Sequence, residues 1–227
     1  MSVDAASIRK MIFWPAVITF AITLLRLVGE LLNWSPALFN RAAGGGGALM
    51  GISWLPPVFG VLFALQLVKA GHGPATGGRA VMRAVLGVLA TVAIIAVFSM
   101  LKILGDGQFS FAGLLIFTLA IAVGAAVAWS GWPDLGRTLL AYAFAARIPF
   151  ALVMLVAMIA NWGTHYDVAP PSFPAEMGVF TKWLMIGLLP QMTTWIAITV
   201  LFGALFGAIA GWLAMRRAAP VARPAVA

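Results

Sequence analysis

Six apolar stretches, each long enough to cross a lipid bilayer as a helix, dominate this sequence. The hydrocarbon core of a bilayer is about 30 Å thick and a helix rises about 1.5 Å per residue, so a span needs about 20 residues. The stretches cover residues 11–33, 48–69, 81–103, 109–131, 137–161 and 184–214. Only 9% of the 227 residues are charged and the mean hydropathy is +1.05, values that exclude an ordinary soluble domain. We therefore predict an all-α, polytopic integral membrane bundle with six transmembrane helices.

The positions of lysine and arginine predict the orientation, because cytoplasmic loops are enriched in both residues. A cytoplasmic N-terminus leaves only Arg41, Lys102 and Lys182 among the loop cations on the outside. With an even number of spans the C-terminus is cytoplasmic too, and we expect the cytoplasmic (inner) membrane of a bacterium. Since the basic residues lie in short loops, the net charge of +8 does not indicate nucleic-acid binding. Residues 1–217 are expected to form one transmembrane domain, and residues 218–227 a disordered tail.

The last apolar stretch predicts an irregular helix. Helical character extends from about residue 174 to Arg217, about twice the thickness of the bilayer core. Pro190 removes a backbone hydrogen bond and crowds the preceding turn. We therefore predict that this helix is broken near Pro190, and that residues 174–188 form an interfacial or re-entrant piece before the true span.

Small residues at intervals of four predict how the helices pack. One strip consists of Gly203, Gly207 and Gly211, and a second consists of Ala120, Gly124 and Ala128. Such strips let helix backbones approach closely in a membrane. We expect the fourth and last helices to be neighbours, with a homodimer face as the alternative use of the strips.

Two charged residues, Arg26 and Glu30, interrupt the first apolar stretch. Thr19, Thr23, Arg26, Glu30 and Asn33 follow one another at steps of four, three, four and three, which places all five on one side of a helix. This polar side must avoid lipid. Arg26 and Glu30 are one turn apart and can pair within their own helix, so a self-neutralised structural pair is one interpretation.

A second polar stripe follows the fifth apolar stretch. Its members are Arg147, Met154, Met158, Asn161 and His165. A charge at the bilayer centre costs about 2.5 to 3.5 kcal/mol on insertion scales, and Arg147 has no acidic residue within a turn or two. Its partner must therefore come from another helix, from backbone carbonyls, from water or from a ligand. We hypothesise that Arg147 faces an internal polar cavity shared with Arg26, with Gln191 of the last stretch at a similar depth.

The outer segment NWGTHYD is the other concentration of polar chemistry. His165 and Asp167 could act as acid and base or as metal ligands, with Tyr166 as a hydrogen-bond donor. The alternative is a cluster of hydrogen bonds that only stabilises the loop. The other histidine, His72, is predicted at the opposite membrane face, so we expect neither a multi-histidine metal site nor any cofactor.

A short sequence repeat, which we call the NW repeat, occurs at the ends of two predicted helices. The first stretch ends LLNWSP and the fifth ends IANWGT, both at the predicted outer face. The repeat suggests that Asn33 and Asn161, with the tryptophans that follow them, frame a common outer vestibule.

Three functions remain open, because the chain has no nucleotide-binding loop, no HExxH motif and no nucleophile elbow. The first is a transporter-like protein that handles a small solute or a lipid and binds an anionic group in an outward-facing pocket. The second is a non-catalytic subunit of a larger membrane complex, with its polar stripes buried against partners. The third is an outer-leaflet enzyme that uses His165 and Asp167. The predicted ligand-binding residues are Arg26, Glu30, Asn33, Arg147, Asn161, His165, Asp167 and Gln191. Membrane lipids and an anionic small molecule or lipid headgroup are the expected partners, alongside membrane-protein partners or a second copy of the chain.

Overall fold

The computed structural model describes residues 2–45, 50–103, 111–171, 173–174 and 176–218. Helices connected by turns make up this part of the chain, and no strand occurs within it. The long helices are α1 (Ala5–Leu31), α2 (Leu55–Lys69), α3 (Gly77–Met100), α4 (Phe111–Gly131), α5 (Pro133–Ala160) and α8 (Thr194–Ala218). The short elements are the 3-10 turn η1 (Ala43–Gly45), α6 (Val179–Lys182), the π-helix η2 (Trp183–Leu188) and α7 (Leu189–Met192). The all-α prediction is confirmed, whereas the predicted tail falls almost entirely outside the described residues.

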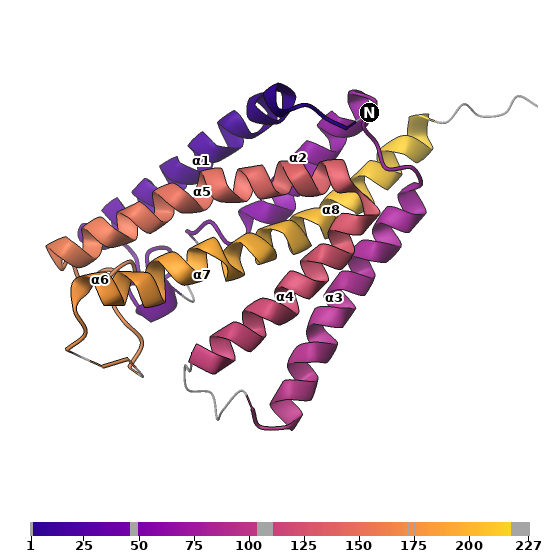
Figure 1. The fold of residues 1–227 in the computed structure, drawn as a ribbon. Coiled ribbons are helices and arrows are strands. Elements are labelled where there is room, and N and C mark those ends of the chain that lie inside the picture. Colours follow the sequence, from indigo (N-terminus) through magenta and orange to yellow (C-terminus); the bar gives the residue numbers. More distant parts are fainter. Residues whose placement is uncertain (1, 46–49, 104–110, 172, 175, 219–227) are drawn as a thin grey trace, which may run out of the picture.

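Helix α8 is the centre of the bundle and contacts α2, α3, α4 and α5 (Figure 1). Helix α1 packs mainly against α5, and α3 packs mainly against α4. The crossing of α2 and α8 is very close, because a Cβ atom on Gly60 would lie 2.3 Å from the carbonyl oxygen of Gly203. Only small residues allow two membrane helices to approach in this way.

Both predicted small-residue strips lie in contacts between helices. Gly203 and Gly207 approach α2 at Gly60, while Gly124 of α4 approaches α3 at Gly87. Gly211 lies against the ring of Trp132, and Ala120 and Ala128 are buried. The fourth and last helices are in contact, as predicted, although the glycines of each strip approach a different helix. Contacts within the chain therefore fill both strips.

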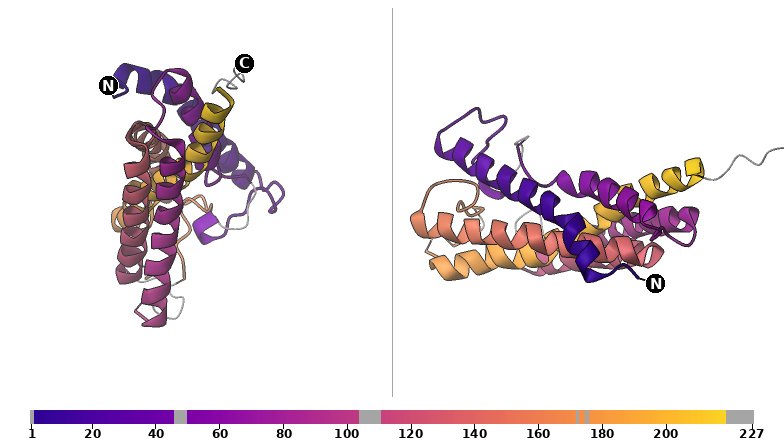
Figure 2. Two further views of the ribbon diagram at one scale, coloured as in Figure 1. Left: turned by 90° about the vertical axis from the view of Figure 1, so that its right-hand side faces the viewer. Right: turned by 90° about the horizontal axis from the view of Figure 1, so that it is seen from above.

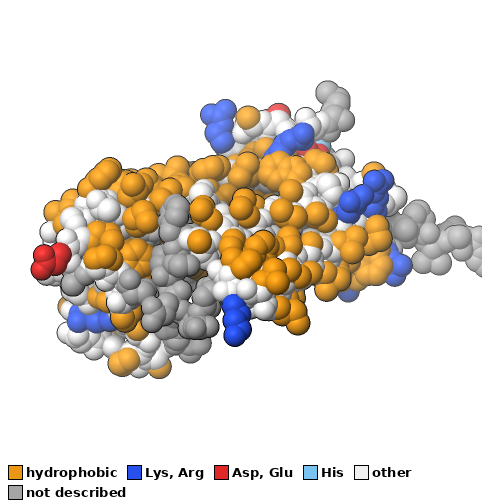
Figure 3. Space-filling view, turned by 60° about the horizontal axis from the view of Figure 1, so that its bottom comes forward, with side chains coloured by type: hydrophobic (Ala, Val, Ile, Leu, Met, Phe, Trp, Pro, Cys, Tyr) orange, Lys and Arg blue, Asp and Glu red, His pale blue; other side chains and the backbone are white. Residues whose placement is uncertain are grey.

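The surface and the helix lengths indicate an integral membrane protein. Five helical segments are long and apolar enough to cross a membrane: Ala5–Leu31, Gly77–Met100, Ala112–Gly131, Pro133–Ala160 and Val179–Arg217. Exposed side chains on these segments include Trp14 and Leu119, and Figure 3 shows hydrophobic side chains over much of one face with Lys and Arg at its margins. A water-soluble protein could not keep so much large apolar surface exposed.

The predicted second span, residues 48–69, is wrong at its beginning. Helix α2 starts at Leu55 and has 15 residues, which makes it shorter than the five candidate spans. Pro56 and Pro57 occupy its first turn. Proline has no N–H to donate, so this pair fits the first turn of a helix, where an N–H has no acceptor within the helix, and not the interior of a longer one.

The last helical segment is interrupted near Pro190, as the sequence predicts, but no loop separates its two parts. It begins at Val179 rather than at 174, passes through the π-helical turns of η2, and continues into α7 and α8 as one rod (Figure 2). Pro190 has no N–H for the carbonyl one turn earlier, and the π-helix before it accommodates that loss. Thr193 then leaves the helical region, with φ −121° and ψ −78°. The predicted piece at 174–188 is therefore wrong at its beginning, because the helix starts at Val179 and no loop separates it from the span; its interfacial or re-entrant position stays a prediction.

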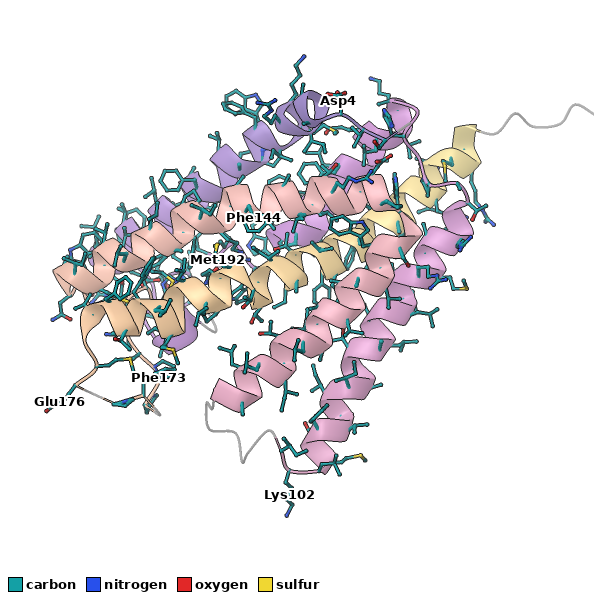
Figure 4. All side chains as sticks on the ribbon, viewed as in Figure 1. Asp4, Lys102, Phe144, Phe173, Glu176 and Met192 are labelled. Atoms are coloured by element: carbon teal, nitrogen blue, oxygen red, sulfur yellow. The ribbon has the colours of Figure 1, made fainter. Side chains whose placement is uncertain are left out.

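Helix ends gather at two ends of the bundle. At one end Val3 donates its N–H to Asp134 at 3.2 Å, Trp132 donates to the carbonyl of His72 at 2.9 Å, and Gly77 lies against the ring of another tryptophan. These contacts bring together the starts of α1, α3 and α5 and the last turns of α8. The opposite end carries the connections between α1 and α2 and between α5 and α6, and we call it the loop end. In Figure 4, Asp4 marks the first end and Glu176 marks the loop end.

Candidate functional site

A cavity of about 560 Å³ lies at the loop end, between α1, α4, α5 and the α7–α8 segment. We call it the loop-end pocket. Most of its lining is apolar, and the polar side chains come from separate parts of the chain. They are Thr23, Arg26, Ser53, Arg147, His165, Gln191 and Thr194. Four of the predicted ligand-binding residues, Arg26, Arg147, His165 and Gln191, therefore line one cavity.

The polar stripe of the first helix faces the interior of the chain. Its buried members are Thr19, Thr23, Arg26 and Glu30. Tyr142 of α5 hydrogen-bonds the Thr19 hydroxyl at 2.8 Å, and Tyr166 donates its hydroxyl to the carbonyl of Thr23 at 2.8 Å. The expectation that this side avoids lipid is confirmed for these four residues.

Glu30 is the centre of a buried hydrogen-bond network behind the pocket. Its carboxylate accepts a hydrogen bond from Arg26 Nε at 2.8 Å, so the predicted pairing within α1 is confirmed. The same carboxylate accepts the backbone N–H of His165 at 2.9 Å, and its Oε1 lies 2.5 Å from His165 Nδ1. His165, which is distant in sequence, thus binds the same carboxylate as Arg26. Glu30 is 1% exposed and stands behind the pocket rather than lining it.

The same network holds the loop between α1 and α2 against α1. Arg26 Nη2 donates to the carbonyls of Asn40 at 3.1 Å and Gly45 at 3.0 Å, and the Arg41 guanidinium donates to the backbone carbonyl of Glu30. Gly45 has a φ of +65°, and a Cβ there would lie 2.6 Å from the His165 ring and 2.9 Å from Arg26 Nη2. Only glycine fits this place, in both backbone angle and space.

Arg147 has a different environment from Arg26. The side chain is 3% exposed, and Gln191 Oε1, at 3.2 Å, is its one hydrogen-bond partner among the described residues. The guanidinium carbon lies 4.6 Å from the ring of Trp195 and 6.0 Å from the ring of Phe150. No carboxylate of the described residues forms an ion pair with Arg147. The hypothesis of a cavity shared by Arg26 and Arg147 agrees with this geometry, whereas ligand binding there stays a prediction.

Asp167 does not form the predicted acid–base pair with His165. Its carboxylate accepts the N–H of Gly163 at 2.8 Å, and the N–H and hydroxyl of Thr164 at 2.7 and 2.6 Å. Three donors from its own turn hold it away from the pocket, so for Asp167 the loop-stabilising interpretation is the correct one. The imidazole of His165 contacts Glu30 instead.

Asn33 and Asn161 lie outside the loop-end pocket, so ligand binding by these residues and the outer vestibule stay predictions. Both are exposed and have positive φ, +55° and +52°. The following residues donate their N–H groups five residues back, Trp34 to Gly29 at 2.8 Å and Trp162 to the end of α5 at 3.3 Å. This pattern is a Schellman motif, in which asparagine sometimes replaces glycine. The NW repeat therefore marks two similar helix ends.

Burial shifts the pKa values of two loop residues that line the pocket. It lowers the pKa of His165, against the opposing effect of the Glu30 carboxylate. It also raises the pKa of Tyr166 well above its usual value. The described residues contain no group of three or more histidine, cysteine or acidic side chains that would hold a metal ion.

Sequence reasoning missed the part of the pocket that the loop between α1 and α2 supplies. Gly45 and Ser53 line the cavity, and neither is among the predicted ligand-binding residues. Gly45 takes part through its backbone carbonyl, which accepts a hydrogen bond from Arg26 and leaves no mark in a residue pattern. Trp195 was missed as well, although its place within the last apolar stretch, away from the ends, is a signal for the aromatic contact with Arg147.

Comparisons with known proteins add no family to this geometry. No protein-family model matches the chain, and no significant similarity to a curated protein or to a solved structure is found. The residues of the loop-end pocket are therefore the basis for any functional inference.

Proposed function

We propose that the chain is a transporter-like membrane protein that handles a small solute or a lipid and binds an anionic group in the loop-end pocket. One observation carries the proposal: Arg147 is buried in a mostly apolar cavity with Gln191 as its hydrogen-bond partner and no ion pair to a described carboxylate. A guanidinium has five N–H donors, and its geometry suits carboxylate and phosphate oxygens.

The contrast with Arg26 supports this proposal. Arg26 has a carboxylate and two backbone carbonyls, so its charge and its donors are satisfied inside the protein. An unpaired buried charge is costly, and ionisable residues within membrane segments usually serve function. An anion beside Arg147 would supply the missing countercharge, and Gln191 would orient it.

The proposed topology has six crossings, with both termini on the cytoplasmic side and the loop end outside. The arrangement of helix ends supports it, because the starts of α1, α3 and α5 meet the last turns of α8. In this topology α2 crosses the membrane in addition to the five longer helical segments, and it packs against α8. The chain has no cysteine, so single cysteines introduced at Glu176 and Arg79 test it directly. A membrane-impermeant thiol reagent added to intact cells should label the first position only, and labelling of Arg79→Cys alone would reverse the orientation.

Anion binding is tested by thermal stability of the purified protein in detergent. The probes are inorganic phosphate, acetate and phosphatidylglycerol, with phosphatidylcholine as the zwitterionic control. A ligand at 100 times its Kd stabilises the folded state by about 2.7 kcal/mol. At least one anion should raise the unfolding midpoint, and Arg147→Gln should abolish this rise.

Arg216→Gln is the matched control for Arg147→Gln. The Arg216 guanidinium lies 4.1 Å from the ring of Trp212, so it repeats the arginine–tryptophan contact outside the pocket. This variant should keep the stabilisation by anions. Stabilisation that survives Arg147→Gln, or that no anion produces, would refute the proposal.

An outer-leaflet enzyme is the second candidate, favoured by the contact between His165 and Glu30. A carboxylate that binds one imidazole nitrogen leaves the other available for proton transfer, and His165 lines the pocket. The acid–base pair would then be Glu30 and His165, not His165 and Asp167. The subunit alternative has lost its main argument, because the polar stripe of α1 is buried within the chain.

A further inference from the structure

The loop-end pocket combines charged and apolar lining. Arg26, Arg147 and His165 lie on α1, on α5 and in the loop that follows α5. Helix α4 contributes only apolar side chains to the lining, Leu114 and Phe117. A mostly apolar pocket with buried cations matches a molecule that has both an anionic group and an apolar part.

The pocket is partly open where α4 lines it. Phe117 lines the pocket while 40% of its surface is exposed, so among the described residues this part of α4 does not seal the cavity from the surroundings. Thr118 of α4 and Thr194 of α8 hydrogen-bond each other through their hydroxyls. Leu114 and Phe117 precede this contact on α4, just as Pro190 and Gln191 precede it on the other helix. The opening therefore lies on the loop-end side of the threonine pair.

Beyond the threonine pair the two helices separate. Among the described residues, helix α4 has substantial contact with α3, α5 and α8 but no substantial contact with η2 or α7. Figure 1 shows α4 and the α6–α7 segment diverging toward the loop end. The neighbouring outer face of α4 carries exposed Leu115 and Leu119, which are suited to lipid chains. An opening at this depth between two spans faces the bilayer rather than water.

We infer that the ligand is a membrane amphiphile with an anionic headgroup, which reaches Arg147 sideways from the bilayer between α4 and the α7–α8 segment. This inference rests on the proposed function and specifies the ligand class and its route. The headgroup contacts Arg147 and Gln191, while an acyl chain lies along Leu114 and Phe117. Confinement to the membrane brings such a ligand to the opening, which a water-soluble anion would have to reach through the outer loops.

Three probes distinguish binding of a lipid from binding of a free anion. Dioleoyl phosphatidylglycerol is the anionic lipid and dioleoyl phosphatidylcholine is the zwitterionic control. Glycerophosphoglycerol is the headgroup of phosphatidylglycerol without its acyl chains. Binding of the lipids to the detergent-solubilised protein is measured by native mass spectrometry, and binding of the headgroup by calorimetry. Phosphatidylglycerol should bind most tightly, and Arg147→Gln should weaken it by about tenfold or more, the usual effect of a lost charge-assisted hydrogen bond.

Substitutions on α4 test the route itself. Leu114→Trp fills the opening and should weaken phosphatidylglycerol binding, and Phe117→Trp is a second variant at the same place. Leu115→Trp, at the exposed neighbouring position, is the matched control and should bind normally. A thermal unfolding midpoint checks that each variant is folded.

The outcomes distinguish the two proposals. If the headgroup alone binds as tightly as the lipid and still requires Arg147, the lateral route is overturned while the anion pocket stands. If phosphatidylglycerol does not bind, or if both α4 tryptophan variants bind it normally, the inference is overturned as well. If both lipids bind equally to the native protein and to Arg147→Gln, the anion pocket itself fails.

Discussion

Replacing Glu30 by glutamine should destabilise the protein more than any other single change at the loop end. The carboxylate is 1% exposed and accepts three hydrogen bonds, from Arg26 Nε at 2.8 Å, from the His165 N–H at 2.9 Å and from His165 Nδ1 at 2.5 Å. Removing one partner of a buried ion pair costs about 3–5 kcal/mol. Glutamine keeps the shape and one accepting oxygen, which retains a hydrogen bond worth about 1 kcal/mol. We therefore expect a net loss of about 2–4 kcal/mol.

The assay is denaturant unfolding in detergent micelles, followed by tryptophan fluorescence. Glu176→Gln is the matched control, because Glu176 is exposed at the loop end, between α5 and α6 (Figure 4), and should change stability by less than about 0.5 kcal/mol. The double variant Arg26→Gln, Glu30→Gln should be less destabilised than the sum of its two single variants, since it leaves no unpaired charge. A loss for Glu30→Gln no larger than that of the control would refute the reasoning.

Three further predictions concern packing, a helix end and pH. Gly60→Ala should cost about 1–3 kcal/mol of unfolding free energy, because its Cβ would lie 2.3 Å from the backbone oxygen of Gly203, whereas Gly78→Ala meets nothing within 4 Å and should not destabilise. Asn161→Val should cost about 1–2 kcal/mol by the same assay, because φ is +52°, while Asn161→Gly should be nearly neutral; equal effects would contradict a backbone cause. Burial lowers the pKa of His165 from about 6.5, so the folded state disfavours its protonation; stability should be full above about pH 6.5 and fall at lower pH. His165→Gln should lose this part of the pH dependence, measured as the unfolding midpoint between about pH 8 and about pH 5.

Local chemistry explains which features could be predicted from the sequence. Residues four apart on a helix are neighbours, so the pairing of Arg26 with Glu30 follows from spacing alone. The inward face of α1 follows from the same periodicity together with the cost of polar groups in lipid. The distortion before Pro190 follows from the missing N–H, although the sequence does not distinguish a break from a π-helical turn.

Contacts between distant segments explain what could not be predicted. No spacing rule brings His165 to a carboxylate 135 residues earlier, or a glycine carbonyl of the loop between α1 and α2 to Arg26. The role of Asn33 and Asn161 at helix ends could not be predicted either, because an asparagine beside a polar stripe resembles a ligand-binding residue. Their positive φ angles, which only the structure reveals, identify them as helix terminators.

The charges that line the loop-end pocket favour an anion with a single negative charge. Arg26 is balanced by Glu30 at 2.8 Å, and burial disfavours the charged form of His165. Arg147 then remains as the one pocket-lining charge without an ion pair among the described residues, since Asp167 neither lines the pocket nor pairs with Arg147. A monoanion neutralises this charge, whereas a dianion leaves one buried negative charge without a partner, which is costly. Dioleoyl phosphatidylglycerol should therefore bind more tightly than dioleoyl phosphatidic acid at a pH at which the latter carries two charges, and the reverse order in a competition measurement would contradict this charge balance.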